Sequence, residues 1–139
     1  MTARALRDVL DVRDRVLAYA HAVDRKRLDQ VADCFTPDCA YEGALGTGTI
    51  ADALGTLARA FERYTATMHF MGTQDVACDG DTARAVSYCV AYHVRPDGGH
   101  FTVGVRYYDD LVRADGHWRI CRRVVRTDWM REDASGVIA

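Results

Sequence analysis

Two residues of types used for proton transfer, Asp24 and His69, are the starting point for a functional interpretation. Asp24 follows Leu17 by seven residues and Ala20 by four, so helical periodicity places its carboxylate on or beside an apolar face. An inward carboxylate is costly unless a polar group pairs with it, and His69 is the best candidate partner. A neutral histidine can remove a proton from carbon or oxygen, and a carboxylate on its second ring nitrogen fixes the tautomer and stabilises the imidazolium.

Such a pair suits β-elimination, dehydration or allylic isomerisation, which all begin with removal of a proton. Each residue also has an interpretation without chemistry. Asp24 is a suitable N-cap for a following helix, and His69 is suitable as a hydrogen-bonded core histidine. The residue types of His21, Asp24, His69 and His93 would also allow a metal site, but their spacing matches no metal motif, so no metal is expected.

The elements that position these residues follow from periodicity and turn signals. The pattern predicts helices over 5–23, 26–35 and, after a capping pattern that begins at Thr49, 50–61. The glycine-rich segment 43–48 is expected to be a loop. The predicted strands are 39–42, 65–78, 82–94, 101–113 and 118–127.

Three helices followed by an antiparallel meander predict an α+β domain. Neither face of the 82–94 strand is plainly polar, so one face should pack on helices and the other should line a pocket or an oligomer interface. The face that carries the candidate His93 also carries Ser87, Cys89 and Ala91. One domain is expected over residues 1–130, with residues 131–139 as a C-terminal tail.

Composition narrows the class of protein. The 139 residues are 49% hydrophobic and 27% charged, with a net charge of -2, which argues against disorder and gives no general attraction to nucleic acid or anionic membranes. No apolar run approaches the ~20 residues of a transmembrane helix, and no secretory signal is evident. Five scattered cysteines without a Cys-x-x-Cys spacing favour free thiols in a cytoplasmic protein.

Other sequence patterns do not indicate a function. The arginines near the C-terminus alternate between two faces, so we expect a solvated edge or a salt-bridged interface rather than a nucleic-acid patch; these are Arg119, Arg122, Arg123 and Arg126. There is no dinucleotide fingerprint, P-loop or nucleophile elbow, and no cofactor is expected.

Three stretches together resemble the SnoaL-like branch of the NTF2-like superfamily. They are 19–39, 68–83 with its Met-His-Phe and Asp-Gly-Asp segments, and 107–120 with its Tyr-Tyr-Asp-Asp and Gly-His-Trp segments. The resemblance implies a cone-shaped α+β fold in which three N-terminal helices pack on a strongly curved antiparallel or mixed sheet that encloses a pocket. It also implies a homo-oligomer, either a dimer or a trimer.

Within this superfamily the candidate site resembles those of scytalone dehydratases, hexachlorocyclohexane dehydrochlorinases and bile-acid dehydratases. The resemblance implies catalytic roles for Asp24 and His69 and substrate contacts for Tyr41 and His93. Arg113 is a further candidate for substrate binding if it points inward, where it could stabilise a developing anion. If it points outward, it should stack near Trp118.

The sequence therefore predicts a small cofactor-independent enzyme that acts on a hydrophobic cyclic molecule by elimination or isomerisation. Two alternatives remain open. One is a non-catalytic ligand-binding protein or a subunit similar to the β-subunit of ring-hydroxylating dioxygenases, which the 108–119 stretch also resembles. The other is a polyketide-type cyclase or an epoxide-opening hydrolase. An enzyme needs Asp24 within hydrogen-bond reach of His69 beside an open cavity, whereas a structural subunit would fill that cavity.

Overall fold

A computed structural model describes residues 1–134, which form an α+β fold as expected. The helices are α1 (Ala3–Asp24), α2 (Leu28–Asp33) and α3 (Ile50–Arg63). The strands are β1 (Phe35–Gly43), β2 (Gly46–Thr49), β3 (Ala66–Asp79), β4 (Thr82–Val94), β5 (His100–Ala114) and β6 (His117–Asp133). None of the helices in these residues combines the length and apolarity needed to span a bilayer.

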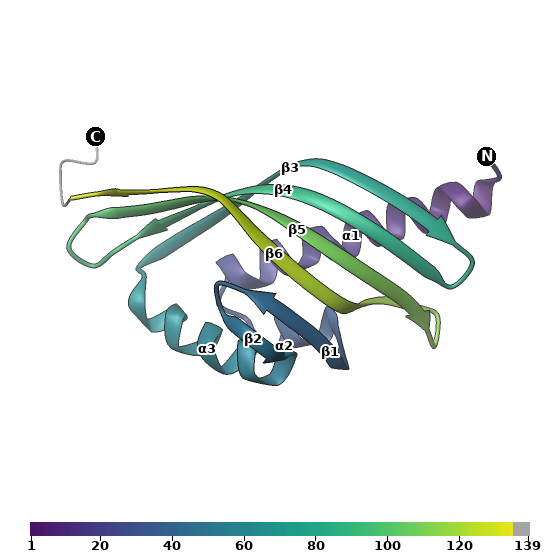
Figure 1. The fold of residues 1–139 in the computed structure, drawn as a ribbon, viewed down its shortest axis with the longest axis horizontal. Coiled ribbons are helices and arrows are strands. Elements are labelled where there is room, and N and C mark those ends of the chain that lie inside the picture. The colour runs from purple at the N-terminus through teal and green to yellow at the C-terminus, as the bar shows by residue number, and fades with distance from the viewer. Residues whose placement is uncertain (135–139) are drawn as a thin grey trace.

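The strands form one mixed sheet in the order β2-β1-β6-β5-β4-β3. Neighbouring strands are antiparallel except β1 and β6, which run parallel. Figure 1 shows α1 crossing behind the long strands, while α3 lies beside β1 and β2. One face of the sheet is therefore covered by helices, and that side of the sheet holds most of the buried residues.

Helix α1 carries Asp24 at its last position. Thr2 caps its start by accepting a hydrogen bond from the Ala5 N–H at 3.0 Å. Its buried stripe includes Val12, Val16, Tyr19 and Val23. Leu6 and Leu10 fit the same helical spacing but do not belong to the buried stripe, because they are 50% and 47% exposed. The first turns of α1 extend beyond the ends of the strands, so the sheet does not cover their apolar side (Figure 1).

One prediction near the sheet edge is corrected. The segment expected to be a loop contains β2, in which Gly46 pairs with Gly43 and Thr49 with Ala40. Glycine-rich sequence is a weak strand former, but here backbone pairing with β1 holds the segment, and Gly46 and Gly48 both have positive φ. Thr49 then caps α3 by accepting from the Asp52 N–H, as the capping pattern predicts.

Strand β6 is longer than expected. It continues past the predicted end at residue 127 to Asp133, which pairs with His100 of β5. Alternation in this stretch is hidden by a register shift opposite Gly104 and Val105, which moves the side chains out of step. Residues 131–133 of the expected tail are thus paired, and residues 135–139 lie outside the described residues.

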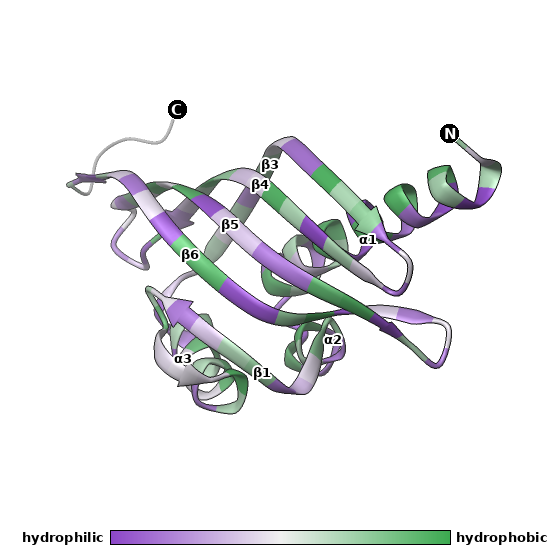
Figure 2. Cartoon of the chain, turned by 45° about the vertical axis from the view of Figure 1, so that its right-hand side comes forward, coloured by the Kyte–Doolittle hydropathy of each residue, from purple (hydrophilic) through white to green (hydrophobic). Residues whose placement is uncertain are grey.

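The outward face of the sheet carries a band of exposed apolar side chains. The register places Phe70 beside Val90, Val90 beside Gly104, and Gly104 beside Trp129, so the band crosses four strands. Figure 2 shows apolar segments alternating with polar ones along these strands. We call this surface the outer patch; its members are Met68, Phe70, Tyr88, Val90, Tyr92 and Trp129, of which all but Val90 are at least 42% exposed.

Candidate active site

A cavity of about 370 Å³ lies between the end of α1, helix α3 and the inward face of the sheet. Its lining is mostly apolar, with Val23, Leu57, Phe61, Val103 and Val125 among the contributing side chains. Polar groups also reach the cavity, and in a small-molecule site such groups fix the orientation of the ligand. They include His69, His93, Tyr41, Tyr19 and Tyr107.

Asp24 and His69 are joined at the edge of this cavity. The Nδ1 atom of His69 lies 2.7 Å from Oδ1 of Asp24, and the His69 backbone N–H donates to Oδ2 at 2.8 Å. The Thr67 hydroxyl donates to Oδ1 at 2.9 Å. Burial opposes ionisation of the Asp24 carboxyl, but these hydrogen bonds outweigh it and lower its pKa below the ordinary value. Asp24 is therefore an ionised acceptor at neutral pH.

The alternative interpretation of Asp24 as an N-cap is wrong. The residue at the N-cap of α2 is Arg27, and no side chain caps that helix. The Asp24 carboxylate points instead to β3, where it meets Thr67 and His69. Strand β3 thus supplies three donors to one carboxylate at the end of α1.

This contact sets the tautomer of His69. Because ionised Asp24 can only accept, Nδ1 of His69 carries the proton and donates it to Oδ1. The other ring nitrogen, Nε2, then has a free lone pair. The ring lines the cavity, and its side chain is 8% exposed. The arrangement is chemically that of a general base whose orientation and positive charge are supported by a carboxylate.

His93 lies on the same side of the sheet as His69, on the face of β4 that alternation predicts. Its ring centroid is 6.0 Å from that of His69, and its Nδ1 donates to the Phe101 carbonyl at 3.0 Å. This bond leaves Nε2 as an acceptor in the neutral ring. Burial lowers the pKa of His93, and the proximity of His69 adds to this effect. His93 is thus suited to accept a hydrogen bond from a substrate hydroxyl.

Tyr41 reaches the cavity from β1 and is 6% exposed. Burial raises the pKa of its hydroxyl, which also bonds to the backbone of Leu45. The hydroxyl is consequently protonated at any physiological pH. Both residues expected to position substrate oxygens, Tyr41 and His93, therefore line the cavity.

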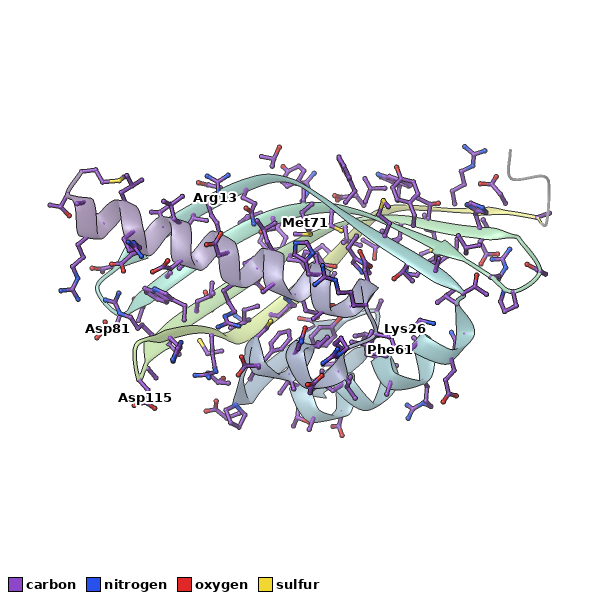
Figure 3. All side chains as sticks on the ribbon, turned by 180° about the vertical axis from the view of Figure 1, so that it is seen from behind. Arg13, Lys26, Phe61, Met71, Asp81 and Asp115 are labelled. Carbon is purple, nitrogen blue, oxygen red and sulfur yellow. The ribbon has the colours of Figure 1, made fainter. Side chains whose placement is uncertain are left out.

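Arg113 is not among the residues around the cavity, so the expected substrate contact is corrected. It lies near the end of β5, bonds to Asp8 and Asp81, and stacks over the Trp118 ring with 4.9 Å from Cζ to the centroid. Figure 3 shows Asp81 near the start of α1 and Lys26 just beyond its end, so this cluster and the cavity lie at opposite ends of a 22-residue helix. The outward alternative is confirmed.

A buried ion pair that the sequence analysis does not predict lies behind the cavity. Arg123 was expected on a solvated edge or interface, yet both it and Asp109 have fully buried side chains joined by two hydrogen bonds. The guanidinium also lies 4.3 Å from the ring centroids of Tyr19 and Tyr107, both of which line the cavity. Burial opposes the charge of Arg123, but Asp109 outweighs it and raises the pKa above the ordinary value.

This pair had a signal in the sequence. Asp109 faces Arg123 across β5 and β6, and Tyr107 precedes Asp109 by two residues on the same face. Opposite charges at cross-strand positions attract each other, and aromatic faces attract a guanidinium, so the pattern favours an ion pair here but does not show that the pair is buried. One nitrogen of Arg123, Nη1, is buried without a hydrogen-bond partner among residues 1–134.

Metal ligation and disulfides have no support in the described residues. Residues 1–134 contain no group of three or more His, Cys, Asp or Glu side chains suited to a metal ion. The five cysteines all lie within this range and are free, and Cys34, Cys39 and Cys89 are buried.

The family follows from a sequence comparison. The model of the SnoaL-like domain matches residues 4–124, and the chain belongs to this family. An uncharacterized protein of Mycobacterium tuberculosis is 30% identical over 129 residues, which cover 89% of this chain and 88% of that protein. This is the family that the residue patterns of the sequence resemble.

Solved structures share the fold. A protein of Novosphingobium aromaticivorans, provisionally named a scytalone dehydratase, has a TM-score of 0.83 and 20% identity and covers 100% of this chain and 94% of its own. Hexachlorocyclohexane dehydrochlorinase LinA-type3 of Novosphingobium barchaimii has a TM-score of 0.82 and 14% identity, with 96% and 95% covered. A second N. aromaticivorans protein, provisionally named an aromatic ring hydroxylase, has a TM-score of 0.82 and 27% identity, with 91% and 94% covered.

Proposed function

We propose that this protein is a cofactor-independent proton-transfer enzyme, a dehydratase or β-elimination lyase or a double-bond isomerase. Its substrate would be a small hydrophobic cyclic molecule bound in the cavity. The observation that carries the proposal is the 2.7 Å contact between Asp24 and His69 beside an open, mostly apolar space. The cavity volume of about 370 Å³ falls in the range of about 300–1,000 Å³ typical of small-molecule sites.

The chemistry starts at Nε2 of His69. This atom removes a proton from a carbon next to a carbonyl or a leaving group, and Asp24 stabilises the imidazolium that forms. In dehydration, the electron pair of the broken C–H bond forms the new double bond as the C–O bond breaks. The imidazolium returns its proton to the departing hydroxyl, which leaves as water. In isomerisation, the same proton returns to a different carbon.

Two further side chains would orient the substrate. Nε2 of His93 accepts from the departing hydroxyl, which fixes that group near His69, since the two rings are 6.0 Å apart. The Tyr41 hydroxyl, protonated because burial raises its pKa, donates to a substrate carbonyl. Arg123 contributes indirectly by holding the rings of Tyr19 and Tyr107 against the cavity.

The fold and assembly belong to the same proposal. The sheet, closed by α1 and α3, would form the cone of an NTF2-like protein with the cavity inside it. The outer patch would be the contact between copies in a homo-oligomer, because its aromatic and methionine side chains are those enriched at protein interfaces. The free thiols favour a cytoplasmic location.

A non-catalytic subunit is the second candidate. The 27% identity to a protein provisionally named as an aromatic ring hydroxylase favours it. The open cavity favours an enzyme instead, since a structural subunit has no need of a free imidazole nitrogen beside unfilled space. A cyclase or epoxide-opening hydrolase would use the same cavity with Tyr41 as the acid.

The test separates proton removal from loss of the leaving group. Exchange of the C2 protons of 1-tetralone in D₂O, followed by NMR, measures the first step alone. Conversion of 3-hydroxy-1-tetralone to fluorescent 1-naphthol and water measures the complete elimination. We expect wild-type protein to catalyse both and His69→Ala to catalyse neither. The exposed His21, outside the cavity, provides the matched control His21→Gln, which should retain full activity.

Exchange without elimination would support proton removal by His69 and would count against a dehydratase acting on this substrate. Absence of both reactions in the wild type, or equal rates in wild type and His69→Ala, would contradict the proposal. Circular dichroism of each variant confirms that a lost rate is not a lost fold.

A further inference from the structure

The charges around the cavity are unequal. Among the described residues that line it, Lys26 and Arg63 are cationic and none is acidic. Both are exposed, whereas the lining residues Val23, Leu57 and Tyr107 are buried. The cavity therefore has an apolar interior and a basic mouth. The nearest functional carboxylate, Asp24, already accepts three hydrogen bonds from β3.

The two cations lie on segments that meet at this mouth. Lys26 follows the end of α1, and Arg63 is the last residue of α3. The Lys26 Nζ donates to the carbonyl of Tyr64 at 2.8 Å, which brings the ammonium next to Arg63 in the chain. Figure 3 shows Lys26 and Phe61, another lining residue, beside one another where α1 ends near α3.

Neither cation is neutralised by a neighbour. The ion pairs formed within residues 1–134 involve many arginines, but neither Lys26 nor Arg63 is among them. One of the three Lys26 donors is used by Tyr64, so two remain. Glu62 is the adjacent acidic residue on α3, but it is exposed and does not line the cavity.

The backbone at Lys26 strengthens the case that its side chain has a role. Its φ is 56°, and the Arg27 and Lys26 N–H groups bond to Ala22 and Val23, which is the pattern of a Schellman motif. Glycine is the usual residue at this left-handed position because a Cβ is unfavourable there. A lysine in its place brings a cation to the cavity at a cost in backbone energy.

We propose that the molecule bound in the cavity is an amphipathic anion, with its ring system in the apolar interior and a carboxylate or sulfonate-type group held by Lys26 and Arg63 at the mouth. This inference rests on the proposed function in that it assigns the substrate class of the same cavity. The anionic group would lie at the mouth, while the carbon that loses its proton would lie beside His69. Substrate would then enter with one fixed orientation.

Two dyes with the same rings test this directly. 8-Anilinonaphthalene-1-sulfonate carries the anion, and N-phenyl-1-naphthylamine lacks it. Both gain fluorescence in apolar sites, so dissociation constants follow from titration. The variant Lys26→Gly/Arg63→Gln removes both charges while placing glycine where the backbone favours it. We expect its affinity for the sulfonate to fall about tenfold, as two exposed ion pairs would give, and its affinity for the neutral dye to stay within about twofold.

Three controls locate the effect. Arg4→Gln/Arg7→Gln removes the same charge from exposed positions on α1 outside the cavity and should change neither affinity. Ala60→Trp fills part of the cavity and should weaken both dyes. The sulfonate affinity of wild type, but not of the Lys26/Arg63 variant, should weaken between about 20 and 150 mM salt because screening increases over that range.

The outcomes are decisive for this inference and separate from turnover. Equal changes for both dyes, no change in the double variant, or unaltered binding to Ala60→Trp would each overturn it. His69→Ala should bind both dyes like wild type. If wild type binds the sulfonate selectively but catalyses no tetralone reaction, the proposed enzymatic function is contradicted and the proposed class of ligand is supported. If wild type converts the tetralone but shows no preference for the sulfonate, the enzymatic function is supported and the anionic ligand class is contradicted.

Discussion

The Asp109 carboxylate accepts two hydrogen bonds from Arg123, at 2.7 and 2.9 Å, with both side chains fully buried. The guanidinium plane is also covered by Tyr19 and Tyr107. The pair therefore joins β5 to β6 directly behind two rings that line the cavity. Removing one member would leave the other charged in an apolar environment.

Asp109→Asn should consequently lower the free energy of unfolding by about 3–5 kcal/mol, the usual cost of breaking a buried ion pair. The exposed pair of Arg106 and Asp128, at 2.8 Å on the same two strands, is a matched control. Asp128→Asn should cost only ~0–1 kcal/mol. Urea unfolding of both variants measures the difference, and equal losses would contradict the assignment of Arg123 as a buried charge paired with Asp109.

Arg113 should matter for stability and not for catalysis. Its bonds to Asp8 and Asp81 are charge-assisted, so Arg113→Gln should lower the free energy of unfolding. Rates with 3-hydroxy-1-tetralone should match wild type at a temperature where both are folded. A fall in kcat of the folded variant would contradict this prediction and indicate that Arg113 has a role in catalysis.

The hydrogen bonds to Asp24 predict graded effects on the proton-transfer rate. Asp24→Asn removes the negative charge that fixes the His69 tautomer and stabilises the imidazolium, and kcat should fall by roughly 10²–10⁴, the usual range for general acid–base catalysis. Thr67→Val removes one donor to the same carboxylate and leaves the Asp24–His69 contact in place, so its effect should be much smaller. Deuterium exchange into 1-tetralone measures both, and a larger loss in Thr67→Val would contradict this order.

Burial of His93 predicts a pH dependence of stability. Its pKa in the folded protein is lowered from 6.5, so the unfolded chain binds a proton first as the pH falls. The contribution of neutral His93 is therefore complete above pH 6.5 and is lost as the pH falls through its folded-state value. Urea unfolding at several pH values should show the advantage of wild type over His93→Gln shrinking below pH 6.5. A constant difference would be inconsistent with a neutral, buried His93.

The outer patch predicts self-association. Phe70 is a member of this patch and is 64% exposed, so Phe70→Glu places a charge within the proposed contact. Light scattering coupled to gel filtration should give an oligomer for wild type and a lower mass for Phe70→Glu. Leu6, exposed on the far end of α1, provides Leu6→Glu as a control that should leave the mass unchanged. A monomeric wild type at tens of micromolar would refute the proposed interface.

Much of this arrangement could be anticipated from the sequence because local and periodic signals agree. Helical spacing placed Asp24 next to an apolar stripe, and strand alternation placed His93 on the inward face of β4. The cap at Thr49 also followed from spacing alone. The partner of Asp24 is 45 residues away, and there the argument depended on the cost of an unpaired inward carboxylate and on family resemblance.

The errors have a common physical origin in long-range contacts. The glycine-rich β2 is a strand only because β1 lies beside it, and β6 extends to Asp133 only because β5 provides pairing partners as far as His100. Leu6 and Leu10 fit the helical stripe, but the sheet does not reach them. Arg113 and Arg123 differ in location because one lies near the end of the β5–β6 hairpin and the other at its middle, which alternation alone does not reveal.

The parallel pairing of β1 with β6 has a consequence during synthesis on the ribosome. Residues 40–42 bond to residues 122–124, so about eighty residues must be translated before β1 acquires its central neighbour. The Asp24–His69 contact, in contrast, needs only α1 and the β3–β4 hairpin. An emerging chain could therefore assemble its proton-transfer pair while the Tyr41 side of the cavity still waits for the last strand, so nascent chains that stall before residue 120 would carry a base without an enclosed site.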